Sequence, residues 1–189
     1  MTLRQLLQDK RDTIARAWLE YVLATYPGHS SAVFARERDP FANPVGHSLR
    51  VGTERILDVL LDRTDVGEVR EHLLAIMKIR AVQQFAPAQA VGFVFRLREI
   101  VRAELGGAAA DPQFSVELAQ LDAQIDRMAL VAFETYVECR EQVYQLRINE
   151  VKRQVSWIMG KVNQQDPGPE LVQITRSPEG GNVGREDTR

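Results

Sequence analysis

The sequence predicts an all-α protein, and three observations indicate this. Apolar residues recur every three or four positions through most of the chain, which is typical of one-sided helices. Proline and glycine mark the breaks between these runs. Between Pro112 and Val162 there is no further proline, and Gly160 is the one glycine. With 189 residues, of which 44% are hydrophobic, the chain is long enough to bury one core without disulfides.

The first apolar helical run begins near the N-terminus and ends at Tyr26-Pro27-Gly28. Residues 29–42 are expected to be irregular, because they contain Ser30-Ser31 and Asp39-Pro40. Asn43-Pro44 predicts the start of the next helix, with Asn43 as the N-cap and proline at the first helical position. The apolar residues of the first run are Leu3, Leu6, Leu7, Ile14, Trp18, Leu19, Val22 and Leu23, and those of the next helix are Leu49, Ile56, Leu57, Leu60 and Leu61.

Two more helices are expected between Val69 and Leu105. The first continues to about Val82, and Ala86-Pro87 marks a corner because the residue before proline avoids helical geometry. The second begins at Pro87, and Gly106-Gly107 ends it. Although Phe93-Val94-Phe95 resembles a strand, the flanking period of 3.6 residues favours a helix.

The last predicted helix has about 50 residues and a length of about 75 Å, whereas a domain of this size is about 30–40 Å across. It must therefore project beyond the body or bend. Its first half is apolar enough for the core, with Phe114, Leu118, Leu121, Ile125, Met128, Leu130, Val131 and Phe133. We therefore expect a helical body over residues 1–142, a projecting helix over 143–163 and a disordered tail over 164–189, where glycine and proline concentrate.

The second half of this helix carries a heptad pattern. Six apolar residues are spaced 4, 3, 4, 3 and 4 positions apart: Tyr144, Ile148, Val151, Val155, Ile158 and Val162. Such a narrow stripe is typical of a coiled coil, and it predicts the interface of a homodimer. The alternative is that the helix packs on its own body.

Composition excludes several classes of protein. The chain has 24 basic and 26 acidic residues, a net charge of −2, which does not favour nucleic-acid binding. One cysteine excludes an intrachain disulfide framework. The sequence contains no apolar run of 18 residues, which a helix that crosses a membrane would need. The N-terminus also has no apolar segment typical of a secretion signal. We therefore expect a cytoplasmic protein.

No motif points to an enzyme or a metal site. The chain lacks a glycine-rich phosphate loop, a GxSxG sequence and a HExxH sequence, and His29, His47 and His72 form no i, i+4 pair. We expect no cofactor, although His72 or His47 is a candidate axial ligand if haem is bound. Cys139 precedes Arg140, which would favour the thiolate, but a single helical cysteine is also a common packing residue.

The corner at Ala86-Pro87 holds the candidate ligand site. Three polar residues, Arg80, Gln83 and Gln89, stand among apolar ones that include Phe85 and Phe93. A buried arginine needs hydrogen-bond partners, which corner carbonyls or amide side chains supply. The corner is therefore either a structural feature or a pocket that binds a small-molecule signal.

Two stretches carry a resemblance to a known family. Residues 39–46 (DPFANPVG) and 79–97 (IRAVQQFAPAQAVGFVFRL), after a helix with Trp18 and Tyr26-Pro27, resemble the RsbRD N-terminal domain family over about residues 4–160. These are bacterial sensory domains of RsbT co-antagonist, stressosome RsbR-like proteins. The resemblance implies a dimeric, non-haem globin-like fold with a long C-terminal helix leading to an output domain.

The sequence departs from the multidomain members of that family. After Val162 only 27 residues remain, too few for a phosphorylatable output domain. We therefore expect a non-enzymatic sensory module that dimerises and signals to a separate protein partner. The alternatives are a haem- or gas-binding globin-like sensor that uses His72 or His47, and a scaffold protein of a larger complex.

Overall fold

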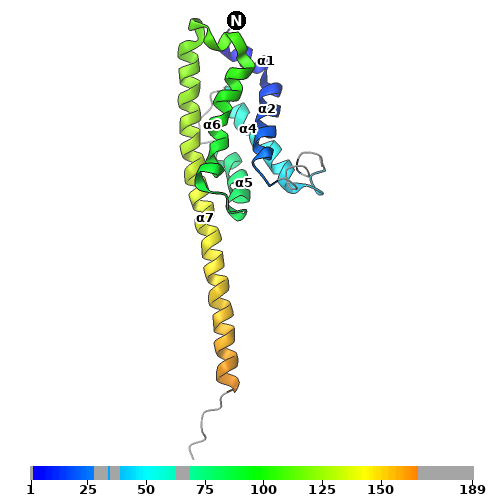
Figure 1. Cartoon of the computed structure of the whole chain (residues 1–189), viewed down its shortest axis with the longest axis vertical. Coiled ribbons are helices and arrows are strands. Elements are labelled where there is room, and N and C mark those ends of the chain that lie inside the picture. Colours follow the sequence, from blue (N-terminus) through cyan, green and yellow to red (C-terminus); the bar gives the residue numbers. More distant parts are fainter. Residues whose placement is uncertain (1, 28–33, 35–38, 63–68, 166–189) are drawn as a thin grey trace, which may run out of the picture. The chain divides into compact units, whose positions relative to one another are not determined.

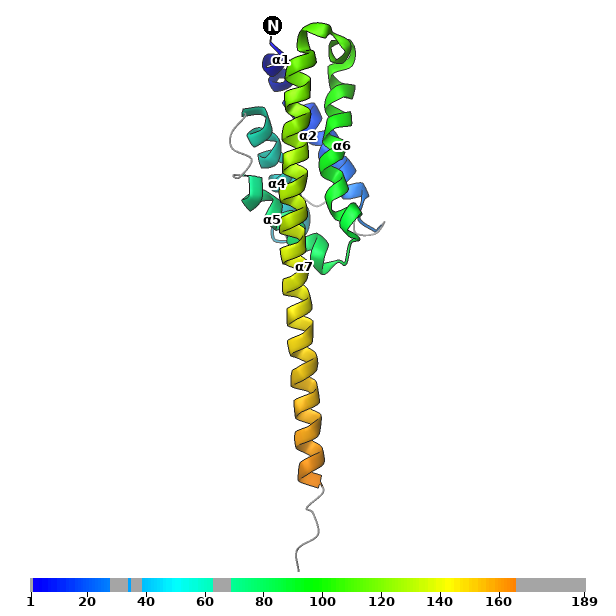
Figure 2. The ribbon, with the colours of Figure 1, turned by 90° about the vertical axis from the view of Figure 1, so that its left-hand side faces the viewer.

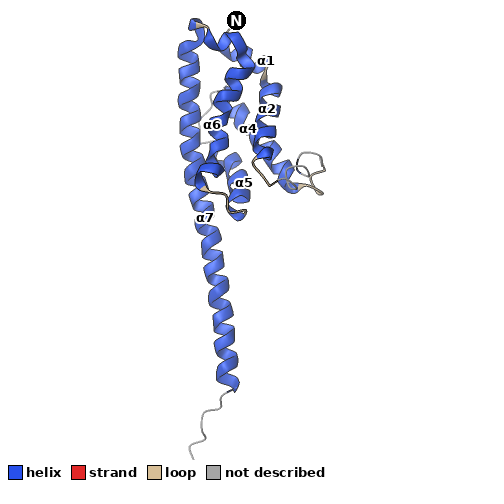
Figure 3. Ribbon diagram, in the orientation of Figure 1, coloured by secondary structure: helices blue, strands red, loops and turns tan. Residues whose placement is uncertain are grey.

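The structure is a computed structural model that describes residues 2–27, 34, 39–62 and 69–165, with side chains as far as Lys161. His29 and residues 166–189 of the predicted tail lie outside the described residues. Every regular element in the described ranges is a helix, as Figure 3 shows, which confirms the predicted all-α class. The chain divides into two units, one that ends at Arg147 and one that begins at Ile148.

The helices follow the order shown in Figure 1. They are α1 (Leu3–Asp9), α2 (Arg11–Ala24), α4 (Pro44–Asp62), α5 (Val69–Val82), α6 (Pro87–Leu105) and α7 (Ser115–Gln165), with the 3-10 turns Gly106–Ala110 and Pro112–Phe114 before α7. The prediction of one helix from Leu3 to Tyr26 is wrong. Lys10, at φ −101° and ψ 4°, interrupts it, so two helices form.

Asn43 begins α4 as predicted. Its Oδ1 accepts a hydrogen bond from the Gly46 amide at 2.8 Å, and its Nδ2 donates to the Phe34 carbonyl at 3.1 Å. Both ends of this side chain are therefore held in place. A Cβ at position 46 would lie 2.2 Å from Asn43 Nδ2, so only glycine leaves room for this cap.

Gly106 ends α6, also as predicted. Its φ of +56° lies in the left-handed region, which glycine enters without a steric penalty. The chain then turns into α7, whose first part lies beside α6 in both Figure 1 and Figure 2.

The core of the first unit forms where α2, α4, α5, α6 and the first part of α7 pack together. Trp18 anchors it: the indole stacks on Phe93 at a centroid distance of 5.6 Å, and Nε1 donates to the Phe93 carbonyl at 2.8 Å. This polar bond satisfies the indole N–H inside the core. Trp18 thereby fixes α2 against α6.

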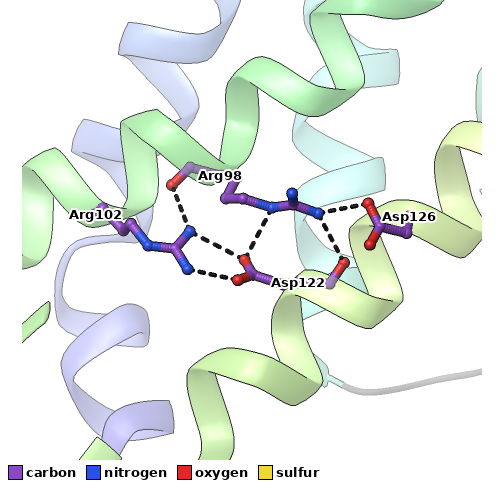
Figure 4. A network of polar contacts seen from close by, with 4 residues as sticks. All are labelled: Arg98, Arg102, Asp122 and Asp126. Atoms are coloured by element: carbon purple, nitrogen blue, oxygen red, sulfur yellow. Dashed lines mark hydrogen bonds and ion pairs between the residues drawn. The ribbon is translucent and has the colours of Figure 1, made fainter. Parts of the chain in front are cut away.

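Ion pairs join α6 to α7, as Figure 4 shows. Asp122 Oδ1 lies 3.0 Å from Arg98 Nε and 3.0 Å from Arg102 Nη1, so one carboxylate pairs with two arginines on consecutive turns of α6. Arg98 also pairs with Asp126. The network sets the register of α7 along α6.

The predicted core face of α7 is partly wrong. Leu130 is 69% exposed and Phe133 is 50% exposed, although Phe114, Leu118, Leu121, Ile125 and Met128 are buried as expected and Val131 is half-buried. The buried face continues through Ala132, Tyr136 and Cys139. Leu130 and Phe133 are out of phase with this face, so their side chains point away from the core.

The second unit contains the rest of α7. Its large apolar side chains are exposed among the described residues: Ile148, Val151, Val155, Trp157, Ile158 and Met159. Val162 lies beyond the last residue whose side chain is described. Within the described part of the chain, no helix has the length and hydrophobicity needed to cross a membrane.

Candidate functional site

The candidate site lies where α5 turns into α6. Arg80 is in the last turn of α5, and the amides of Gln84 and Phe85 donate to the carbonyls of Ala81 and Arg80 at 3.2 and 3.1 Å. Gln84 adopts a left-handed φ of 61°, which is uncommon for a residue other than glycine. This tight turn places Phe85 directly beside Arg80.

Arg80 is completely buried. Its Nη1 donates to the carbonyl of Gln89 at 2.8 Å and, at 3.5 Å, to that of Ala90, while Nη2 donates to Thr25 Oγ1 at 3.0 Å. The predicted corner carbonyls therefore accept from the guanidinium. The arginine joins the end of α2 to the start of α6.

Three aromatic rings surround the Arg80 guanidinium. Its Cζ lies 5.3 Å from the ring centroid of Tyr26, 4.9 Å from that of Phe85 and 4.7 Å from that of Phe93. These distances are within the range of cation–π attraction. We call Arg80 with these three rings and Thr25 the Arg80 cluster.

The electrostatics of the cluster are unusual. Burial lowers the pKa of Arg80, although the neighbouring Tyr26 opposes this change. Burial raises the pKa of Tyr26, and here Arg80 opposes the change. Because an arginine in a protein keeps its proton even so, the cluster carries a full positive charge inside the core.

Of the five predicted ligand-site residues, the structure brings together Arg80, Phe85 and Phe93. The side chains of Gln83 and Gln89 are exposed, and Gln89 contributes its backbone carbonyl. Sequence reasoning did not place Thr25 or Tyr26 in the site, because Thr25 stands 55 positions before Arg80. The apolar stripe of the first helical run ends at Tyr26, and this stripe was the one feature of the sequence that could have indicated that Tyr26 is buried.

The corner is bonded directly to α7. The hydroxyl of Tyr136 donates to the carbonyl of Phe85, and Arg140 Nη1 donates to the carbonyl of Ala81 at 3.2 Å. The other end of the Arg140 guanidinium donates to the hydroxyl of Tyr144. Tyr136 and Arg140 therefore bond α7 to the backbone of the corner.

Two open grooves lie elsewhere in the first unit. One, of about 500 Å³, lies between α2 and α4 and is lined by Ala15, Leu19 and charged side chains that include Arg11, Arg16, Arg50 and Glu54. The other, of about 590 Å³, follows the surface of α7 along Leu130, Phe133 and Val137. The first is largely polar, whereas the second exposes an apolar face.

The remaining candidate residues lie on three different helices, α4, α5 and α7. His47 is exposed on α4 and His72 is half-buried on α5, so the haem alternative stays a prediction, which the absorption spectrum of the purified protein tests. No group of three or more histidine, cysteine or acidic residues with metal-binding geometry occurs in the described ranges. Of the two alternatives for Cys139, the structure favours the packing residue over the thiolate: the thiol is buried, and this burial raises its pKa.

Comparison with known proteins gives one match. A family model described as the RsbT co-antagonist protein rsbRD N-terminal domain matches residues 12–151, which is more than half of the 189-residue chain. The matched range includes all of the Arg80 cluster and the part of α7 that contacts it. No curated protein and no solved structure matches the chain.

Proposed function

We propose that this chain, which belongs to the family of RsbT co-antagonist protein rsbRD N-terminal domains, is a homodimeric sensor that receives a signal at the Arg80 cluster. The family is one of stressosome-related regulatory and sensory domains. In this proposal α7 carries the signal to a separate protein partner in the cytoplasm, and the chain catalyses no reaction.

The observation that carries this proposal is the bonding between the corner and α7. Tyr136 and Arg140 donate to two carbonyls of the corner, those of Phe85 and Ala81. A ligand shifts a conformational equilibrium only if it binds two states with different affinity. A ligand that displaces Phe85 would change the Tyr136 bond, and the free energy of that change would act on α7.

Dimerisation is supported by the exposed apolar side chains of α7. The predicted interface residues Ile148, Val151, Val155 and Ile158 are about half exposed, which is unfavourable for isolated apolar groups in water. Leu130, Phe133 and Val137 are exposed too, at sequence spacings of 3 and 4 that match the heptad pattern. A second copy of the chain would cover both sets.

The proposed coupling is tested with Tyr136→Phe, which removes the hydroxyl that donates to Phe85 and keeps the ring. We expect the dimer dissociation constant to change several-fold, as measured by sedimentation equilibrium. Tyr21→Phe, on α2, is the matched control and should leave the constant unchanged. If Tyr136→Phe also leaves it unchanged, the corner does not act on the dimer and the proposal fails.

A further inference from the structure

The groove between α2 and α4 has the size of a small-molecule site. Its volume is about 500 Å³, and ligand pockets in proteins are commonly about 300–1,000 Å³. Three apolar side chains line it together with the charged ones: Ala15 and Leu23, which are buried, and Leu19, which is half-buried. The groove therefore offers an apolar surface between charged walls.

The two helices run in opposite directions along this groove. Arg11, at the start of α2, donates from Nε to Asp58, near the end of α4, at 2.6 Å. Just after the end of α2, the ring of Tyr26 packs against Phe34 at a centroid distance of 5.6 Å, and the Phe34 carbonyl accepts from Asn43, which begins α4. The Arg11–Asp58 ion pair therefore marks one end of the groove.

Opposite charges lie on the two walls at the next two levels of the groove. A rise of about 1.5 Å per residue, counted from that ion pair along both helices, places Arg16 level with Glu54 and Glu20 level with Arg50. All four side chains line the groove, and none of them forms an ion pair with another residue that the structure describes. Beyond its paired end, the groove thus holds complementary charges that are not joined.

We propose that this groove binds a free α-amino acid with an aliphatic side chain, between Glu20 and Arg50. The ammonium group of the amino acid would pair with Glu20 and its carboxylate with Arg50, whose guanidinium suits a carboxylate because it can donate two parallel hydrogen bonds. The inference is independent of the function proposed for the Arg80 cluster, because the groove contains no residue of that cluster.

The charges of the two walls favour a zwitterion over an ion of one sign. A simple carboxylate would gain Arg50 but would be repelled by Glu20, and a simple amine would gain Glu20 but would be repelled by Arg50. An α-amino acid carries both charges on adjacent groups, so it can pair with both walls at once. The groove should therefore distinguish an amino acid from its deaminated and amidated analogues.

The apolar lining favours the level of Glu20 over that of Arg16. Leu19 and Leu23 are an i, i+4 pair on α2 and flank Glu20, whereas the smaller Ala15 lies next to Arg16. An aliphatic side chain that packs on the two leucines removes apolar surface from water. Leucine is therefore the probe of choice for the site.

The test is calorimetric titration of the full chain with L-leucine, leucinamide and 4-methylpentanoate at two temperatures, so that a zero enthalpy at one of them does not hide binding. The three ligands share the aliphatic chain, but leucinamide lacks the carboxylate and 4-methylpentanoate lacks the ammonium group. We expect leucine to bind with a dissociation constant of about 1 mM or below, and the other two to bind at least about tenfold more weakly, since each loses one charge-assisted pair.

Two variants test which residue recognises which charge. In Glu20→Gln the partner of the ammonium group is lost, so leucine and 4-methylpentanoate should bind with similar affinity. In Arg50→Gln the partner of the carboxylate is lost, so leucine and leucinamide should bind with similar affinity. Arg55→Gln is the matched control, because Arg55 is exposed on α4 and does not line the groove, and it should leave all three affinities unchanged.

The inference is overturned if leucine gives no saturable heat at either temperature up to about 10 mM, tenfold above the expected dissociation constant. Equal binding of the three ligands to the wild type also overturns it, because the protein then recognises neither charge. Binding that Glu20→Gln and Arg50→Gln leave unchanged would place the amino acid outside the groove. Equal losses in Arg50→Gln and Arg55→Gln would show a general effect of charge and would likewise contradict the site.

Discussion

Arg140 lies over the ring of Tyr144, with its Cζ 4.6 Å from the ring centroid. The same guanidinium donates to the Tyr144 hydroxyl and, from Nη1, to the carbonyl of Ala81. Arg140 therefore contacts both the corner that contains the Arg80 cluster and the first residue of the predicted dimer interface. A single side chain connects the proposed sensing site to the proposed interface.

Replacing Arg140 with methionine should weaken both the fold and the dimer. The change keeps an apolar stem but leaves the carbonyl of Ala81 without this donor, and such losses cost about 1 kcal/mol. We expect the free energy of unfolding to fall by about that amount in urea denaturation, and the dimer dissociation constant to rise. Arg147→Met is the control, since Arg147 is exposed on the same helix. Equal effects of the two substitutions would show that Arg140 has no special role.

The network in Figure 4 predicts a difference between two aspartates of α7. Asp122 is 24% exposed at its side chain and pairs with both Arg98 and Arg102, whereas Asp126 is 56% exposed and pairs with Arg98. Asp122→Asn should cost about 1–2 kcal/mol in the free energy of unfolding, since it removes a shared, partly buried partner. Asp126→Asn should cost less than about 0.5 kcal/mol, because exposed ion pairs contribute little.

Salt provides the check on this explanation. Added salt screens the exposed pair, so the small effect of Asp126→Asn should disappear first. Negligible losses in both variants would show that apolar packing alone holds α6 against α7, and equal losses of about 1 kcal/mol or more would show that the sharing of Asp122 has no special effect.

Cys139 should react slowly in the native protein. The thiol is 2% exposed, and burial raises its pKa, so the reactive thiolate is scarce at neutral pH. We expect a disulfide reagent to modify it at less than about one hundredth of the rate seen in denaturant, with native reactivity rising only at pH values above the usual thiol pKa. Rapid modification of the native protein at neutral pH would contradict the buried position.

Helix boundaries could be predicted where their causes are local. Asn43, the proline of Ala86-Pro87 and Gly106 act through bonds or dihedral angles within a few residues, and the structure places helix ends at all three. The interruption at Lys10 has no such marker, since neither glycine nor proline stands near it. The apolar periodicity alone therefore predicted a single helix where the structure has α1 and α2.

The contents of the core and the site depend on contacts between distant segments. The first part of α7 has two apolar stripes, one through Ile125 and Ala132 and another through Leu130 and Phe133, and spacing does not tell which one faces the body. The sequence was enough to predict that a buried Arg80 needs carbonyl acceptors, because each guanidinium N–H is a strong hydrogen-bond donor. Its contact with Thr25 and Tyr26 depends on how α2 packs against α5 and α6, which no local pattern encodes.

The predicted dimer interface is tested by Ile148→Asp combined with Val155→Asp. Both side chains are about half exposed in the single chain, so the change should leave the fold of the first unit intact. In a coiled-coil seam each aspartate would place a charge against an apolar partner, which costs several kcal/mol per dimer. We expect a monomer mass by light scattering, with the circular dichroism of the wild type at the same concentration.

The matched control shifts each aspartate by one residue, as Asn149→Asp with Ser156→Asp. The same two charges then stand on the same turns of α7 but outside the heptad positions, so the dimer should persist. A dimer that survives in the Ile148 and Val155 variant would place the interface elsewhere, and the exposed face of Leu130, Phe133 and Val137 would be the next to test. Dissociation of both variants would instead indicate that added negative charge on this segment, rather than a buried seam, controls association.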